Sequence, residues 1–303
     1  METLTASFSS IDLRRLCHVT IEKNEHNSSK RVGPWNHESL KSPPACAGGM
    51  KGTVVVTGGS RGLGYALSRQ LVLHHDVARV VLVSRNAEEL QKACARLRRE
   101  SLAEIYAFRA DVTDPVQVAR CADAAETEGP IRAWINNAGY AGGYELVRDR
   151  SPEGIRHVID ATLTSTALGC REAVHRRVPV VVNVAGGGSS GEACPTFAVY
   201  GACKRGLVGL TESLALEEPE TCFGLVWPGM FRSRLLLDGM GQPARFVFER
   251  LAADPNTVAA DIAPQIASLT KNPRPGAVRH LTRFVPTLRR AVSSILPPNK
   301  KAS

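Results

Sequence analysis

Aromatic residues are scarce in this sequence, and its cysteines form no recognisable pairs. Aromatic residues make up 5% of the 303 positions, which argues against the stacking surfaces of nucleic-acid-binding proteins, so we expect no nucleic-acid partner. The eight cysteines include no C-x-x-C pair, and no histidine follows at metal-ligand spacing. We therefore expect free thiols in a reducing compartment and no metal site.

Long hydrophobic runs are also missing. No stretch of 18 or more apolar residues occurs, so the sequence predicts no transmembrane helix. Residues 1–50 lack the apolar centre of a secretory signal and contain many serines and threonines. We interpret them as a leader that is either disordered or a plastid transit segment, although their acidic residues depart from a typical transit composition.

Residues 271–303 contain eight lysines and arginines and no acidic residue. They therefore supply +8 of the whole-chain net charge of +9. Such a basic segment gives information about the binding partners of the protein rather than about its fold. The alternative is that it only makes the terminus soluble. Within residues 284–303, the stretch "TLRRAVSSIL" has apolar residues on one helical face and basic and polar ones on the other. This basic amphipathic tail suits peripheral contact with a membrane or a partner groove, or docking on its own domain or on a second subunit.

Strand-like and helix-like segments alternate across residues 51–283. Short apolar, β-branched runs are typical of strands buried on both faces, and the segments between them have apolar residues at helical spacing. The alternation predicts an α/β fold with a doubly wound parallel sheet in a single domain, with residues 231–270 as an irregular helical insertion. The expected strands lie within 52–59, 78–86, 104–114, 131–139, 178–188, 222–230 and 276–282, and the expected helices within 63–75, 87–100, 151–174 and 196–217.

The glycine-rich stretch "TGGSRGLG" at 57–64 joins the first expected strand to the first expected helix. Gly58 permits the tight turn, Gly62 lets the backbone approach a pyrophosphate, and Gly64 lets the helix pack near the strand. The start of the helix offers backbone N–H groups to phosphates. The motif in this context predicts a dinucleotide site that also includes Ser60 and Leu63.

The end of the second expected strand indicates which dinucleotide binds. An enzyme that prefers NAD usually places an acidic residue there, whereas this sequence has Ser84 and Arg85, and the glycine loop adds Arg61. Two guanidinium groups suit a 2′-phosphate, so NADPH is favoured over NADH. The alternative is that both arginines are ordinary surface residues.

Taken together, these motifs resemble the short-chain dehydrogenase/reductase family over about residues 51–240. The resemblance rests on the glycine loop, D-V-T-D at 111–114, N-N-A-G at 136–139, Y-x-x-x-K at 200–204 and P-G at 228–229. It implies a doubly wound sheet, a nicotinamide cofactor, a small-molecule substrate and a homo-oligomer. The further cofactor-site residues that it implies are Asp111 and Val112 beside the adenine, together with Asn137, Ala138, Gly139, Pro228 and Gly229.

Tyr200 and Lys204 are the expected proton-transfer pair. Residues four apart share one face of a helix, and a nearby ammonium would lower the phenol pKa from its usual value of about 10. Tyr200 could then donate a proton to a carbonyl oxygen while hydride arrives at the carbon. In the family, this lysine also holds the nicotinamide ribose.

Two positions depart from the family pattern. Gly187 stands thirteen residues before Tyr200, where a serine is usual, and Thr162 stands where an asparagine is usual. Ser189 and Ser190, just downstream, are the candidates to supply the missing hydroxyl. Either Ser189 and Thr162 act as substitutes, or the site is weakened, since a missing donor at a developing oxyanion costs about 3 kcal/mol.

A narrower resemblance is to the chlorophyll b reductases of the non-yellow-colouring type. It rests on "RAWINNAG", "LTSTALGCREA", "GGGSSGEACPTFAVYGACKRGL" and "PGMFRSRLLL". It implies reduction of the C7 formyl group of chlorophyll b with NADPH, in a chloroplast and in association with thylakoids. The alternatives are a general carbonyl or steroid-like reductase, in the cytoplasm if there is no plastid leader, and a weakened cofactor-binding scaffold.

Overall fold

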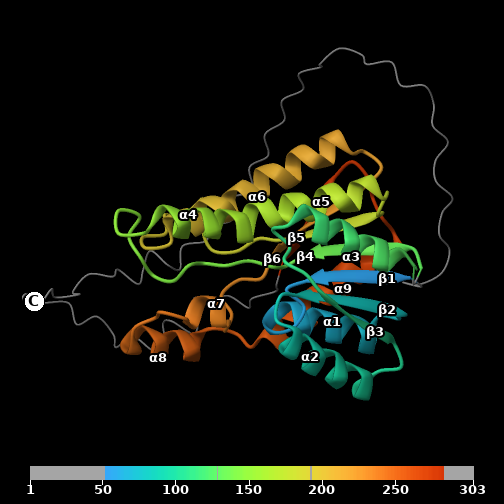
Figure 1. Cartoon of the computed structure of the whole chain (residues 1–303), viewed down its shortest axis with the longest axis horizontal. Helices are drawn as coiled ribbons and strands as arrows, with labels where there is room; N and C mark the ends of the chain where they lie inside the picture. The colour runs from blue at the N-terminus through green and yellow to red at the C-terminus, as the bar shows by residue number, and fades with distance from the viewer. Residues whose placement is uncertain (1–51, 128, 192, 283–303) are drawn as a thin grey trace, which may run out of the picture. The chain divides into compact units, whose positions relative to one another are not determined.

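The structure is a computed structural model that describes residues 52–127, 129–191 and 193–282 (Figure 1). The predicted leader and the predicted basic tail lie outside the described residues. In the part of the chain that the structure describes, no helix combines the length and apolar character needed to cross a membrane.

Seven parallel strands form a single sheet in the order β3-β2-β1-β4-β5-β6-β7, which confirms the predicted doubly wound fold. Every residue of β1 and of β5 is buried, as the runs of valine predict for strands covered on both faces. The strands are β1 Thr53–Thr57, β2 Arg79–Ser84, β3 Glu104–Arg109, β4 Ile131–Asn136, β5 Val180–Val184, β6 Cys222–Trp227 and β7 Val278–Thr282.

Helices cover both faces of the sheet (Figure 1). One apolar cluster joins the sheet to α1, α2 and α9, and a second joins it to α3, α5 and α6. The helices are α1 Gly62–His74, α2 Ala87–Glu100, α3 Pro115–Thr127, α4 Pro152–Ile159, the π-helix η1 Asp160–Thr164, α5 Ser165–His175, α6 Ala198–Glu217, α7 Arg234–Leu237, α8 Gln242–Leu251 and α9 Pro255–Lys271.

The interpretation of residues 231–270 as an irregular insertion was wrong for their second half. Asp254 caps α9, a regular helix of 17 residues that packs on the sheet, and Ile262 and Ile266 are fully buried in the core. Pro264 inside α9 hides this regularity in the sequence. The single helix expected over 151–174 is also divided, because η1 interrupts it.

The order of the strands fixes where a ligand can bind. β1 pairs with β2 on one side and with β4 on the other, so the chain reverses its winding direction at β1. Parallel sheets bind ligands outside the carboxyl ends of their strands at such a reversal. The glycine loop follows β1 there, and the N-N-A-G turn follows β4.

Candidate active site

The glycine loop is built for close contact with the turn after β4. A Cβ atom on Gly64 would lie 2.5 Å from Asn137 Nδ2, and one on Gly58 would lie 2.9 Å from the same atom. Asn137 Nδ2 donates to Thr57 O at 3.0 Å and to Gly58 O at 3.3 Å. Gly58 also has a φ of +64°, so both glycines are required by the backbone geometry.

The hydroxyl of Thr57 joins these two loops. Thr57 Oγ1 accepts from the backbone N–H of Asn137 at 3.0 Å and of Ala138 at 3.1 Å. This threonine begins the glycine motif, but its role as an anchor was not predicted from the sequence. It fixes the two predicted cofactor-binding segments against each other.

The start of α1 fits a phosphate group. Arg61, which precedes the helix, makes no side-chain cap hydrogen bond, and the first turn has no acidic residue. Gly62 has a φ of +56°, and a Cβ added to it would meet open space. The side chain of Leu63 is buried in the core, so Leu63 offers a ligand only its backbone N–H. Backbone donors facing open space at a helix start suit a pyrophosphate.

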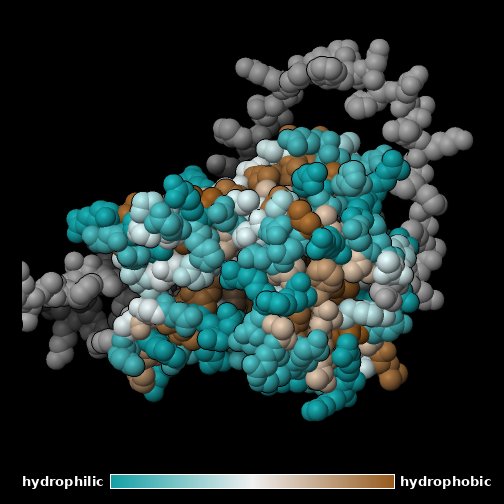
Figure 2. Space-filling model, in the orientation of Figure 1, coloured by the Kyte–Doolittle hydropathy of each residue, from teal (hydrophilic) through white to brown (hydrophobic). Residues whose placement is uncertain are grey.

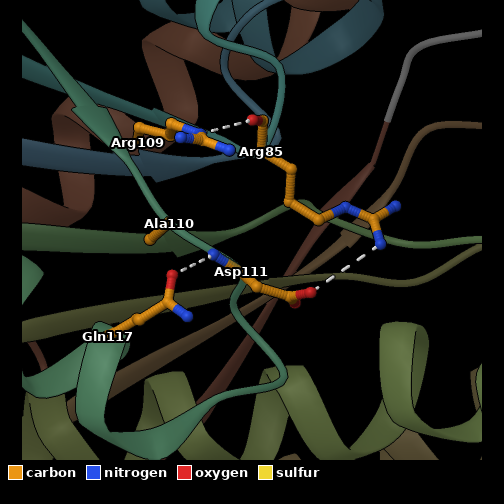
Figure 3. A pocket seen from close by; sticks show the side chains of 5 residues that line it. All are labelled: Arg85, Arg109, Ala110, Asp111 and Gln117. Atoms are coloured by element: carbon orange, nitrogen blue, oxygen red, sulfur yellow. Dashed lines mark hydrogen bonds and ion pairs between the residues drawn. The ribbon is translucent and has the colours of Figure 1, made fainter.

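A pocket of about 400 Å³ lies where β2 and β3 end (Figure 3). Asp111, expected beside the adenine, lines it, and its backbone N–H donates to Gln117 Oε1 at 2.9 Å. Arg85 Nη1 lies 3.9 Å from Asp111 Oδ2. Arg109 also lines the pocket and donates from Nε to Arg85 O at 3.3 Å, although it belongs to no motif in the sequence. The side chain of Val112 packs on the core nearby.

The other cofactor-site residues predicted in the glycine loop and at the end of β2 also lie close together. Ser60 Oγ donates to Ser84 Oγ at 3.0 Å, which joins the glycine loop to the end of β2. Arg61 Nη1 contacts both carboxylate oxygens of Glu89, each at 3.2 Å. Glu89 was not predicted, because the sequence does not distinguish it from Glu88, the other acidic residue in the first turn of α2.

Tyr200 and Lys204 are both on α6 and both buried, with 8% and 4% of their surfaces exposed. Lys204 Nζ donates to Val184 O at 2.7 Å and lies 5.6 Å from the centre of the Tyr200 ring. A Cβ atom on Gly139 would be 3.9 Å from Lys204 Nζ, which places the turn after β4 beside the pair. The Lys204 amine therefore lies near both the Tyr200 ring and the turn after β4.

The predicted lowering of the Tyr200 pKa was wrong for this structure. Burial raises the pKa of the Tyr200 phenol, and the nearby Cys203 and Cys194 thiols raise it further. Burial also lowers the pKa of Lys204 to about 8. The phenol thus keeps its proton at neutral pH, as a proton donor requires, and Lys204 is the group of the pair that titrates near neutral pH.

The loop after β5 carries glycine where the family usually has serine. A Cβ on Gly186 would lie 3.4 Å from Tyr200 Oη, whereas one on Gly187 would meet nothing within 4 Å. The position facing the phenol is therefore Gly186 rather than Gly187, one residue earlier than sequence counting gives. Ser189 Oγ donates to Gly186 O and accepts from Gly186 N, the latter at 2.8 Å. These bonds close the loop on itself.

Replacing Gly186 with serine tests whether the site lacks a hydroxyl donor. The backbone of Gly186 is not in the left-handed region, and a Cβ atom there would be at ordinary contact distance from Tyr200 Oη, so the Cβ of a serine is accommodated. We expect kcat for a small aldehyde to rise about tenfold, a part of the 10²–10³ that one oxyanion donor contributes. An unchanged or lower kcat in a variant with normal cofactor affinity would show that another group already supplies this donor.

Thr162 lies in η1 and holds the turn that follows Gly139. Its hydroxyl accepts from Tyr140 N at 3.2 Å and donates to Tyr140 O at 3.0 Å. The side chain is fully buried, and π-helical turns are frequent at functional sites. In this structure Thr162 orients the backbone beside Lys204, so its geometry is that of a positioning residue.

A network of buried asparagine side chains joins the elements that carry the site. Asn136 Nδ2 donates to Asn183 Oδ1, and Asn183 Nδ2 donates to Thr211 Oγ1, both at 2.9 Å. Trp134 Nε1 donates to Asn136 Oδ1 at 2.9 Å. This network ties the ends of β4 and β5 to α6, which carries the Tyr200 pair. After the end of β6, Gly229 of the predicted pair Pro228–Gly229 has a φ of +67°, in the left-handed region that favours glycine.

Tyr200 belongs to an apolar cluster of aromatic and aliphatic side chains. Phe197 lies edge-on to Tyr200, with ring centres 6.1 Å apart, and Tyr144 lies edge-on to Phe197 at 4.3 Å. Leu235 of α7 packs on the same cluster. Figure 2 shows hydrophobic residues set back between the surface around α4 and that around α7 and α8. This wall suits a largely apolar substrate.

Comparison with known proteins identifies relatives that cover about three quarters of the chain. The family model for short chain dehydrogenases matches residues 52–237. A chloroplastic chlorophyll(ide) b reductase NOL from Oryza sativa subsp. japonica is 34% identical over 245 residues, covering 76% of this chain and 71% of the relative. The protein of the same name from Arabidopsis thaliana is 32% identical over 244 residues, with 76% and 70% covered.

Solved structures agree with this assignment. A short chain dehydrogenase from Mycobacterium smegmatis has a TM-score of 0.64 and is 27% identical, with 81% of this chain and 98% of the other covered. The match of the family model includes the glycine loop, the N-N-A-G turn and the Tyr200–Lys204 helix. The chain therefore belongs to the short-chain dehydrogenase/reductase family and is an oxidoreductase of that family.

Proposed function

We propose that this protein reduces the C7 formyl group of chlorophyll b to a hydroxymethyl group, with NADPH as reductant, in a plastid. The observation that carries the proposal is the similarity, across more than two thirds of their length, to plant proteins named chlorophyll(ide) b reductase and chloroplastic. The apolar wall of Tyr144, Phe197 and Leu235 beside Tyr200 supports a large apolar substrate.

The residues of the site have separate roles in this proposal. NADPH, when bound, supplies a hydride to the carbonyl carbon. Tyr200 donates its phenolic proton to the carbonyl oxygen, and Lys204 holds the nicotinamide ribose and keeps positive charge near the oxygen. Thr162 positions the backbone around Lys204, and Ser189 closes the loop that faces the phenol. The phosphates lie at the start of α1.

The test is to incubate the purified protein with NADPH and chlorophyll b and to identify the pigment product. We expect a hydroxymethyl product formed in equal amount to the NADPH consumed. A protein that oxidises NADPH with small aldehydes but leaves chlorophyll b unchanged would contradict the pigment assignment and support a general carbonyl reductase.

A second candidate is a cofactor-binding scaffold with weakened chemistry. It is favoured by Gly186, which offers no hydroxyl beside Tyr200 Oη, and by Thr162, whose hydroxyl is held by the Tyr140 backbone. A scaffold would bind NADPH yet reduce no carbonyl in a broad panel of aldehydes and ketones. The predicted homo-oligomer and the predicted membrane contact of residues 284–303 remain predictions under either function.

Replacing both Arg61 and Arg85 with alanine tests the choice of cofactor. We expect the affinity for NADPH to fall about 10²-fold and that for NADH to change less than threefold, because each charge-assisted contact to phosphate contributes about 1.5–3 kcal/mol. Fluorescence titration of the reduced cofactors measures both values. Equal losses would mean that the two guanidinium groups do not contact the 2′-phosphate.

A further inference from the structure

Glu89 of α2 connects the glycine loop to the segment that follows β6. Its Oε1 atom accepts from Arg61 Nη1 at 3.2 Å and from Arg234 Nη1 at 3.3 Å. Arg61 belongs to the glycine loop, whereas Arg234 is the first residue of α7 and lies 145 positions from Glu89 in the sequence. One carboxylate oxygen thus holds guanidinium groups from two sides of the site.

These ion pairs are exposed to solvent, so each arginine can readily exchange Glu89 for another anionic partner. The exposed fractions of the side chains are 54% for Arg61, 63% for Arg234 and 32% for Glu89. Exposed pairs contribute little to stability and are screened by salt. A phosphate monoester carries more charge than a carboxylate and has three acceptor oxygens, so it can replace Glu89 as the shared partner of both arginines.

The charge at this corner also favours an anion. Arg61 and Arg234 share the single carboxylate of Glu89. At the neighbouring ends of β2 and β3, Arg85 and Arg109 lie with the single carboxylate of Asp111. In both groups the guanidinium groups outnumber the carboxylates, which favours a phosphate monoester with a charge of about −2 at neutral pH.

The rest of α7 contacts the substrate side of the site. Leu235 packs against the cluster that contains Tyr200. Tyr144 Oη donates to Leu236 O at 2.9 Å, so the loop after β4 also holds this short helix. A change in the partner of Arg234 therefore acts on a helix that packs on the cluster to which Tyr200 belongs.

We propose that Arg234 binds the 2′-phosphate of NADPH together with Arg61 and Arg85, and that Glu89 competes with this phosphate for Arg61 and Arg234. The proposal rests on the proposed use of NADPH. When the phosphate replaces Glu89, it draws the start of α7 toward the cofactor and fixes Leu235 beside Tyr200. The 2′-phosphate thus orders the substrate side as well as selecting the cofactor.

The experiment measures the binding of 2′,5′-ADP and of 5′-AMP to the full chain by calorimetry. Arg234→Gln should weaken 2′,5′-ADP about tenfold, the loss expected for one charge-assisted contact, and leave 5′-AMP unchanged. Glu89→Gln should strengthen 2′,5′-ADP about threefold by removing the competing charge. The matched control is Arg232→Gln, since Arg232 precedes α7 and is 43% exposed but pairs with Asp254; it should change neither affinity.

Two results would overturn the proposal. One is an Arg234→Gln variant that binds 2′,5′-ADP as wild type does, or that loses both nucleotides equally. The other is weaker binding of 2′,5′-ADP by Glu89→Gln. Hydrogen exchange of residues 233–238 should also slow when 2′,5′-ADP is added to wild type but not to Arg234→Gln, and equal slowing in both would refute the link to α7. Failure of the NADPH proposal itself is distinct, because wild type would then bind the two nucleotides equally.

Discussion

Tyr200→Phe is expected to lower kcat for carbonyl reduction by about 10²–10⁴-fold, the contribution of a positioned general acid. The phenol is 8% exposed and burial raises its pKa, so it holds a proton throughout the neutral range. Removing one hydroxyl leaves the ring, its edge-on contact with Phe197 and the Lys204 hydrogen bond to Val184 O in place. Steady-state rates with a soluble aldehyde measure the loss.

The control for this variant is its affinity for NADPH, which should stay within about threefold of wild type. Tyr144→Phe is the matched substitution, because Tyr144 belongs to the same aromatic group and its hydroxyl contacts Leu236 O rather than the centre of the site. We expect a far smaller loss of kcat from Tyr144→Phe. If Tyr200→Phe kept at least one tenth of the wild-type kcat, Tyr200 would not be the proton donor.

Lys204→Met should lower kcat/KM by about 10²–10³-fold, because it removes a positive charge next to the developing oxyanion. In wild type the pKa of Lys204 is lowered by burial to about 8. The protonated form is therefore lost as pH rises through about 8, and kcat/KM, which reports the free enzyme, should fall above that pH. Lys204→Arg stays charged at every accessible pH, so its remaining activity should show no such decline.

Stability supplies an independent check on the same lysine. The folded protein binds the Lys204 proton more weakly than the unfolded chain, whose lysine pKa is about 10.5, so burial of the charge costs stability fully below pH 8. That cost disappears as pH rises from 8 to 10.5. At pH 7, Lys204→Met should be about 2 kcal/mol more stable to urea than wild type, after allowance for the lost hydrogen bond to Val184 O. A destabilised variant would show that the folded protein does not lower the pKa of Lys204.

The sheet and the glycine loop were predictable because their signals are local. Valine runs such as Val54–Val56 are typical of a strand buried on both faces of a parallel sheet. Gly58 and Gly64 stand where the surrounding atoms leave no room for a Cβ atom. The regular helical structure of α9 was not predictable from the sequence. Pro264 interrupts the helical pattern of the sequence, whereas packing against α1 in the folded protein stabilises the helix.

The parts of the site that were missed depend on distances between segments far apart in sequence. Counting back from Tyr200 selects Gly187, but the loop geometry turns Gly186 toward the phenol. The contact of Arg234 with Glu89 joins positions 145 apart, and no spacing rule connects them. The pKa of Tyr200 depends on burial, which the i,i+4 spacing with Lys204 does not report.

The most direct test of the account is a single-turnover reaction of the NADPH-loaded protein with chlorophyll b, followed by chromatography of the pigment. We expect wild type to form one hydroxymethyl pigment for each NADPH consumed, and Tyr200→Phe to form none above background. Unchanged chlorophyll b with wild type, or equal product from both proteins, would contradict it.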